Sequence, residues 1–114
     1  MTSVGVQAEQ LAAVFLQQQG LQLVEQNYRC RYGEIDLILR EQKTLVFVEV
    51  RLRKNEQFGG AAASITTQKQ TKLLSTARHY LSGNTNPPPC RFDVVLLNSL
   101  DASKVEWIKN AFGE

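Results

Sequence analysis

The sequence predicts a single α/β domain (residues 1–114) in which helices flank a mixed central sheet of about five strands. Two stretches within residues 33–53 alternate apolar and polar side chains, as strands do. Residues 4–19 and 66–81 instead place apolar side chains at helical spacing, and residues 94–97 form the continuous apolar run expected of an interior strand. A chain of 114 residues has room for one hydrophobic core.

Composition narrows the class of protein. No apolar run approaches the roughly 20 residues of a membrane span, and no signal-peptide pattern is visible, so we expect a cytoplasmic protein without a membrane partner. Cys30 and Cys90 lack the paired spacing of a zinc site and are expected to be reduced. Residues 29–78 hold ten of the thirteen Lys and Arg residues against five acids, which fits either a surface that meets phosphate or scattered solvated charges.

The first helix is expected over residues 4–19, because apolar side chains recur on one face and Gly20 is placed to end it. Glu9 lies on the flank of that face, where an acid early in a helix ordinarily complements the helix dipole. Residues 21–30 are expected to form a strand, after which Arg31 and Tyr32 lead into a turn at Gly33. This arginine–aromatic pair could contact a phosphate, stack on a base, or simply belong to a connecting turn.

The two alternating stretches are expected to pair as an antiparallel hairpin joined by the polar residues 40–44. One face of its first strand would carry Ile35, Leu37 and Leu39, and the opposite face Glu34 and Asp36. One face of its second strand would carry Val48, Val50 and Leu52, and the opposite face Glu49, Arg51 and Arg53.

The register of this hairpin predicts a pair of carboxylates. A turn centred between Gln42 and Lys43 places residues whose numbers sum to 85 opposite each other, so Asp36 faces Glu49 and Glu34 faces Arg51. Like charges about 5 Å apart repel. The pair is therefore either the solvated outer face of an ordinary hairpin or a site for a cation, and Mg²⁺ suits it because this ion takes carboxylate and phosphate oxygens together with waters.

A second helix is expected from a cap at Thr66 or Thr67 to about Leu81. Lys69 should point from its first turns toward the end of the strand that carries Glu49, either as a snorkelling edge residue or as a phosphate contact. Residues 54–63, before this helix, suit either a mobile flap over the hairpin or a plain linker. His79 is the only histidine, and we expect a structural role for it.

The last part of the chain is expected to complete the sheet. Residues 91–97 should form a strand parallel to the one that carries Glu49, because a helix connects the two strands. Arg91 and Asp93 flank the start of this strand and are expected to form a structural ion pair. Residues 104–109 would add a final edge strand.

The hairpin sequence also carries a family resemblance. The string Gly33-Glu34-Ile35-Asp36-Leu37-Ile38, followed by Phe47-Val48-Glu49-Val50-Arg51, is similar to the YraN-like family of small bacterial proteins of uncharacterised function. Its segments resemble PD-(D/E)XK nucleases, especially the archaeal Holliday-junction resolvases. The resemblance spans nearly the whole chain and implies a restriction-endonuclease-like domain. It further implies a site for Mg²⁺, or Mn²⁺, formed by Asp36, Glu49, the backbone carbonyl of Val50, and Glu9 either directly or through water.

The same resemblance implies that Asp36, Glu49 and Arg51 are catalytic. The superfamily pattern has Lys where this chain has Arg51, and arginine stays protonated at any working pH. Arg51 therefore cannot act as a general base, although it can orient the attacking water or stabilise negative charge on the phosphate. The predicted nucleic-acid contacts are Arg31, Arg53, Lys69 and Lys72.

Three functions are compatible with this sequence. The favoured one is a metal-dependent endonuclease that acts on branched or otherwise structured DNA, and a homodimer is attractive because resolving a junction needs two active sites. The first alternative is a non-catalytic nucleic-acid-binding module with a degraded nuclease site. The second is an interaction protein whose carboxylates are relics.

Overall fold

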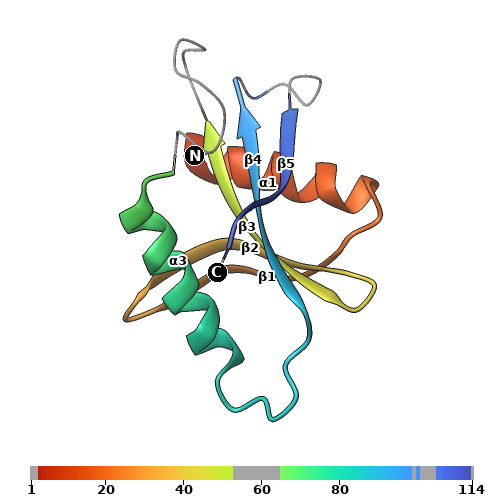
Figure 1. Ribbon diagram of the computed structural model, residues 1–114. Coiled ribbons are helices and arrows are strands. Elements are labelled where there is room, and N and C mark those ends of the chain that lie inside the picture. The colour runs from red at the N-terminus through yellow and green to blue at the C-terminus, as the bar shows by residue number, and fades with distance from the viewer. Residues whose placement is uncertain (1–2, 53–64, 99, 101–104, 114) are drawn as a thin grey trace.

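Five strands form one mixed sheet in the computed structural model, which describes residues 3–52, 65–98, 100 and 105–113 (Figure 1). In chain order the elements are α1 (Val4–Gln18), β1 (Gln22–Cys30), β2 (Gly33–Glu41), β3 (Thr44–Leu52), α3 (Thr67–Leu81), β4 (Cys90–Leu97) and β5 (Val105–Phe112). The strands lie in the order β1-β2-β3-β4-β5, with β3 and β4 parallel and the other neighbours antiparallel. The predicted fold class, an α/β arrangement around a mixed sheet of about five strands, is confirmed.

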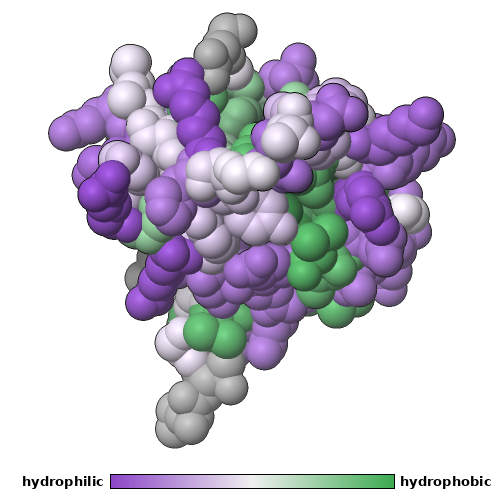
Figure 2. Space-filling model, turned by 90° about the horizontal axis from the view of Figure 1, so that it is seen from below, coloured by the Kyte–Doolittle hydropathy of each residue, from purple (hydrophilic) through white to green (hydrophobic). Residues whose placement is uncertain are grey.

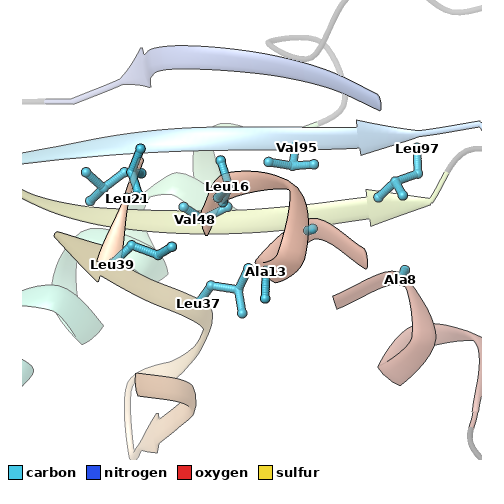
Figure 3. Close-up of a cluster of buried hydrophobic side chains, with 11 residues drawn as sticks. Ala8, Ala13, Leu16, Leu21, Leu37, Leu39, Val48, Val95 and Leu97 are labelled. Atoms are coloured by element: carbon cyan, nitrogen blue, oxygen red, sulfur yellow. The ribbon is translucent and has the colours of Figure 1, made fainter. Parts of the chain in front are cut away.

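Helix α1 packs on one face of the sheet, behind it in the view of Figure 1. Its buried side chains are mostly small, because Ala8 and Ala13 meet the sheet together with Leu16 (Figure 3). Ala12 belongs to the same buried cluster. The strand residues of this cluster are Leu37, Leu39, Val46, Val48, Val95 and Leu97. Small side chains allow the helix to lie close to the strands, and this brings the flank of α1, where Glu9 lies, near the hairpin.

Helix α3 covers the opposite face of the sheet. Leu73 and Ala77 pack there against a second buried cluster of strand residues, namely Ile35, Ile38, Phe47 and Phe92. The Thr66 hydroxyl accepts a hydrogen bond from the Lys69 backbone N–H at 3.1 Å, so Thr66 is the cap of this helix. The cap fixes the first turn of α3 beside the end of β3, as predicted for Lys69.

The turn of the β2–β3 hairpin has the predicted register. Glu41 pairs with Thr44 and Leu37 pairs with Val48, so the loop consists of Gln42 and Lys43. Gln42 adopts a positive φ of 56°, which lets this tight turn follow the twist of the strands. The paired part of the hairpin near its turn is therefore confirmed.

One face assignment in the hairpin is wrong. Ile35 does not share a face with Leu37 and Leu39, because Ile35 packs on the α3 side of the sheet while the two leucines pack on the α1 side. The alternation changes at Asp36, opposite a point of β1 where Asn27 has a positive φ of 54°. An asparagine tolerates this left-handed conformation, and the local irregularity rotates the side chains that follow.

The predicted partner of Glu34 is also wrong. Glu34 pairs with Arg29 of β1, whose Nε lies 2.9 Å from Glu34 Oε2, and not with Arg51 of β3. The β2–β3 ladder extends from the turn to Leu37 and Val48, and beyond this pair the start of β2 follows β1 instead. The hairpin is thus open at its far end, where the two carboxylates lie.

Strand β4 carries the predicted ion pair of Arg91 and Asp93. Asp93 is fully buried, and Arg91 Nε lies 3.0 Å from its Oδ1. The Asp93 carboxylate also accepts hydrogen bonds from Trp107 Nε1 and from the Asn110 backbone N–H, each at 2.9 Å. Because these partners come from β5, the pair joins the last two strands, and β5 runs to Phe112 rather than ending at residue 109.

Some predictions fall outside the described residues. Arg53 and the expected flap or linker at residues 54–63 belong to this group, and they stay predictions. No helix in the described part of the chain is long and apolar enough to cross a membrane. Cys30 and Cys90 are free thiols. Hydrophilic side chains cover most of the face seen from below, with apolar ones gathered in a band (Figure 2).

Candidate functional site

Asp36 occupies the point where the hairpin opens. Its Oδ2 accepts a hydrogen bond from the Val50 backbone N–H at 2.8 Å, so the side chain takes a strand N–H that the β2–β3 ladder leaves available. This bond fixes Asp36 next to the segment of β3 that contains Glu49 and Val50. The irregularity of β2 described above is therefore what positions the first predicted site residue.

Glu49 is the second carboxylate and lies on the α3 side of β3. Its side chain is only 6% exposed, and its Oε2 lies 3.2 Å from Arg51 Nε and 3.6 Å from Lys69 Nζ. Burial, the charge of Asp36 and a hydrogen bond with Asp36 together raise the pKa of Glu49 to about 7, although Lys69 and Arg51 act in the opposite direction. Asp36 and Glu49 are thus brought together. Burial and the repulsion between the two carboxylates affect the pKa of Glu49 more than the attraction of Arg51 and Lys69 does.

Glu9 approaches this pair from α1. Burial raises its pKa, and the negative charge of Asp36 adds to the effect, whereas a hydrogen bond with Asn27 lowers it. The predicted third acid is thus close enough to Asp36 to feel its charge. Sequence reasoning missed Asn27, which shapes the strand at Asp36 and also binds Glu9. An asparagine in the middle of a strand, where this residue type is uncommon, was the signal that could have found it.

The donor set fits a small hard cation. Asp36 and Glu49 offer carboxylate oxygens, the ligands that Mg²⁺ prefers, and a cation between them would relieve the repulsion that raises the pKa of Glu49. Within residues 3–52, 65–98, 100 and 105–113, no three side chains of the His, Cys, Asp and Glu types converge on one point to hold a metal ion. Asp36 and Glu49 are therefore the two carboxylates that could hold such an ion directly, and Glu9 could act only through water or through Asp36.

Arg51 follows Glu49 on the same face, as predicted. Its Nε forms an ion pair with Glu49 Oε2 at 3.2 Å, but this buried nitrogen makes no well-aligned hydrogen bond among the described residues. The side chain as a whole is 38% exposed and can reach a ligand at the surface.

The remaining predicted nucleic-acid contacts lie along α3 and the β1–β2 turn. Lys72 is exposed on α3 beside Gly33, where an added Cβ would lie 3.9 Å from the Lys72 Cβ. Arg31 is exposed in the turn, and one of its guanidinium nitrogens donates to the Tyr32 hydroxyl at 3.0 Å. His79 is paired with the Tyr28 hydroxyl at 2.7 Å, in keeping with the structural role expected for it.

A large cavity lies away from this constellation. Its volume is about 930 Å³, and it is open toward the turn of the β2–β3 hairpin, where Arg40, Lys43 and Tyr80 contribute to its lining. None of the three carboxylates lines it. The carboxylates instead lie farther along β3 from this turn, at Glu49 and beside Val50.

Comparisons with known proteins give the family. A UPF0102 protein from Nitrosomonas europaea is 62% identical over 110 residues, covering 96% of this chain and 93% of that protein. A UPF0102 protein from Psychromonas ingrahamii is 54% identical over 112 residues, covering 98% of this chain and 91% of its own length. Residues 8–97 match the uncharacterised protein family UPF0102. This matched segment includes Asp36, Glu49, Glu9, Arg51 and Lys69. The predicted YraN-like family is confirmed, and the chain belongs to UPF0102.

Proposed function

We propose that this protein is a metal-dependent endonuclease that acts on branched or otherwise structured DNA. The observation that carries the proposal is the pairing of Asp36 with Glu49 at the open end of the hairpin, with Arg51 and Lys69 beside it. Two neighbouring acids, of which Glu49 is buried and Asp36 half-buried, raise the electrostatic energy of the fold, and a purely structural hairpin has no need of them. The resemblance of this chain to PD-(D/E)XK nucleases supports the same function.

Asp36 and Glu49 would hold Mg²⁺ or Mn²⁺, with the Val50 carbonyl as a further oxygen donor and Glu9 behind Asp36. The bound ion would lower the pKa of a water and screen the charge of the phosphodiester. The Val50 N–H keeps Asp36 in one orientation, since the 2.8 Å bond ties the carboxylate to β3. Both acids must be deprotonated to bind a cation, so binding would release the proton that the raised pKa of Glu49 retains near neutral pH.

The two cations next to Glu49 would act on the phosphate. Arg51 stays protonated and can stabilise the negative charge that develops on the phosphate oxygens during attack by water. Lys69 comes from a different element, the first turn of α3, and can bind a neighbouring phosphate. Because both already lie within 4 Å of Glu49, a phosphate placed at the carboxylates would lie within their reach.

A non-catalytic nucleic-acid-binding module is the second candidate, and one observation favours it. Arg51 and Lys69 can neutralise Glu49 without a metal ion, as they do in this structure. A site in which arginine replaces the usual lysine could keep this internal pairing and bind DNA through its other basic residues. The two candidates agree on DNA binding and differ in turnover.

Cleavage of end-labelled DNA tests the proposal. Four-way junctions, flaps, splayed duplexes and a blunt duplex of the same sequence would be incubated with Mg²⁺, Mn²⁺ or EDTA. We expect metal-dependent cleavage of at least one branched substrate, abolished in Asp36→Asn and in Glu49→Gln, with Glu41→Gln as a matched control that remains active. DNA binding without cleavage under any of these conditions would favour the binding module.

We also infer that the active protein is a homodimer, because cutting two strands of a junction needs two sites. Sedimentation of the protein alone and bound to a junction would test this inference. Two copies on one junction are expected, and a single copy that cuts both strands would contradict it.

A further inference from the structure

A ring of aromatic and basic side chains surrounds Tyr32 in the turn between β1 and β2. Tyr32 is 42% exposed, so its ring is accessible to a ligand. The Arg31 guanidinium lies 5.0 Å from the centre of its ring and donates to its hydroxyl at 3.0 Å. These contacts hold the ring upright at the surface instead of letting it fold back onto the sheet.

Helix α3 supplies the other half of this cluster. The ring centre of His79 lies 5.9 Å from that of Tyr32, and the two rings are inclined at 60°. His79 is held in turn by the Tyr28 hydroxyl, 2.7 Å from its Nδ1. Between the turn and the helix lies a cavity of about 340 Å³, lined by Tyr32, Ser75, Arg78, His79 and Ser82. We call this set, together with Arg31, the Tyr32 cluster.

The Tyr32 cluster is connected to the carboxylates along one face of α3. Lys69, Lys72, Thr76 and His79 are spaced three, four and three residues apart, so they follow one stripe of the helix. Lys69 lies at Glu49, Thr76 and Lys72 lie against Gly33, and His79 lies against Tyr32. Ten residues of helix span about 15 Å. Figure 1 shows α3 running from the end of β3 past the β1–β2 turn.

We propose that the Tyr32 cluster is a stacking platform for an unpaired nucleotide of the DNA, about 15 Å from the cleavage site. An exposed aromatic ring beside arginine side chains stacks on bases of any sequence, while the basic groups hold the backbone. In a duplex the faces of the bases are covered by their neighbours, so only a single-stranded segment can use such a ring. The stripe through Lys72 then gives the connecting phosphates a cationic path.

This inference rests on the proposed function, because it assigns the branched class of substrate to a surface next to the same site. It explains how one small domain can prefer branch points and flaps to plain duplex, since those substrates offer unpaired bases close to the cleaved bond. The charge of the cluster favours nucleic acid over an apolar partner. DNA and RNA share this stacking chemistry.

Binding measured without cleavage tests the platform separately from the nuclease activity. Fluorescence anisotropy in EDTA would compare a labelled single-stranded overhang of each polarity, its RNA counterpart and a blunt duplex. Tyr32→Ala is expected to weaken binding of the overhang about tenfold, while Tyr32→Phe keeps it and the duplex affinity of both variants stays within about twofold of wild type. Arg31→Ala should also weaken overhang binding, and Arg40→Ala, which removes an exposed arginine at the other end of β2, serves as its control.

A stacking reporter gives the direct readout. 2-Aminopurine placed a few nucleotides from the branch should be quenched by wild type and by Tyr32→Phe but not by Tyr32→Ala. If Tyr32→Ala leaves both quenching and overhang affinity unchanged, or weakens duplex and overhang equally, the platform is wrong. Metal-dependent cleavage by the same variants then shows independently whether the proposed nuclease activity survives, so the two proposals can fail separately.

Discussion

Two acidic clusters on opposite faces of the sheet, whose central acids Asp93 and Glu49 are one position apart in the β3–β4 register, show how differently carboxylates can be used in one small sheet. In the first, which we call the Asp93 cluster, Asp93 is fully buried and accepts from Arg91, Trp107 and the Asn110 backbone. Arg91 also binds Glu41 and holds the pKa of Glu41 below its ordinary value. Each carboxylate in this cluster therefore faces a cation or a hydrogen-bond donor, although the buried Nη2 of Arg91 makes no hydrogen bond among the described residues.

In the second, which we call the Glu49 cluster, the acids Asp36 and Glu49 face each other. Here the pKa of the acid is raised instead of lowered. Glu49 is nearly as buried as Asp93, yet burial and Asp36 raise its pKa to about 7 in spite of Arg51 and Lys69. The comparison teaches that burial of an acid does not by itself indicate a function. What distinguishes the Glu49 cluster is the direction of the shift, because burial and the charge of Asp36 raise the pKa of Glu49, whereas Arg91 lowers the pKa of Glu41 in the Asp93 cluster.

The largest effect should come from breaking the Asp93 cluster. Asp93→Asn replaces two acceptor oxygens with one and removes one of the two carboxylates that pair with the half-buried Arg91, so we expect a loss of about 3 kcal/mol in the free energy of unfolding. The matched change Glu49→Gln removes a charge that its surroundings oppose and should cost less than about 1 kcal/mol. Urea denaturation measures both, and equal losses would remove the distinction between the clusters.

The next largest effect is expected on the cleavage rate, when Arg51 of the Glu49 cluster is replaced. Arg51→Ala should reduce the cleavage rate about 10²–10³-fold, as expected for the loss of one donor aimed at developing charge, while DNA affinity changes only modestly. Arg51→Lys should retain or raise the rate, because it restores the side chain usual in the nucleases that this chain resembles. Single-turnover cleavage separates these outcomes from binding, and absence of turnover in wild type and Arg51→Lys, despite binding of Mg²⁺ and DNA, would leave the binding module.

The pH dependence of stability should differ in sign between the two clusters. Because the folded-state pKa of Glu49 is about 7 against an ordinary 4.5, the folded protein retains a proton that the unfolded chain releases, and stability falls as pH rises through this window. Each unit of raised pKa corresponds to about 1.4 kcal/mol. Glu49→Gln should flatten that fall. Glu41, with its lowered pKa, contributes stability that is lost as pH decreases, so Glu41→Gln should flatten the acid side instead.

Chemical denaturation of wild type and both variants across pH checks this prediction. If the fall in stability between pH 4.5 and about 7 persists unchanged in Glu49→Gln, groups other than Glu49 cause it.

The smallest effect concerns binding. Lys72→Ala removes one exposed charge on α3 and should reduce the slope of log affinity against log salt concentration by roughly one unit, nearly equally for all DNA sequences. Arg40→Ala also removes one positive charge, but from the end of β2 next to the β2–β3 turn. This variant should leave the slope unchanged. Equal changes in both variants would mean that DNA is not bound on the Lys72 side.

Much of this arrangement could be predicted from the sequence. Apolar periodicity predicts both helices and the strands, and the turn at Gln42 and Lys43 fixes the hairpin register as far as Leu37 and Val48. The crossover through α3 likewise predicts that β4 runs parallel to β3. These features depend on local patterns, which a single sequence shows directly.

The details at Asp36 could not be predicted in the same way. A strict alternation would place Ile35 on the face of Leu37, but Asn27 on the neighbouring strand adopts a positive φ and the alternation breaks. Such irregularities depend on contacts between strands, and here the side chain of Asp36 takes the place of a backbone partner for Val50. The partnership of Glu9 with Asn27 is tertiary in the same sense. The two carboxylates lie one position beyond the last paired residues of the hairpin, so the register at the turn indicated that they are neighbours although the ladder does not reach them.

Binding of Mn²⁺ to the free protein tests the central claim most directly. Isothermal titration above the pKa of Glu49, about 7, would compare wild type with Glu49→Gln and with the control Glu41→Gln. The account predicts one Mn²⁺ per chain in wild type and in Glu41→Gln, and affinity at least about tenfold weaker in Glu49→Gln. Equal binding by all three proteins, or no binding by wild type at millimolar Mn²⁺, would contradict the conclusion that Asp36 and Glu49 form a cation site.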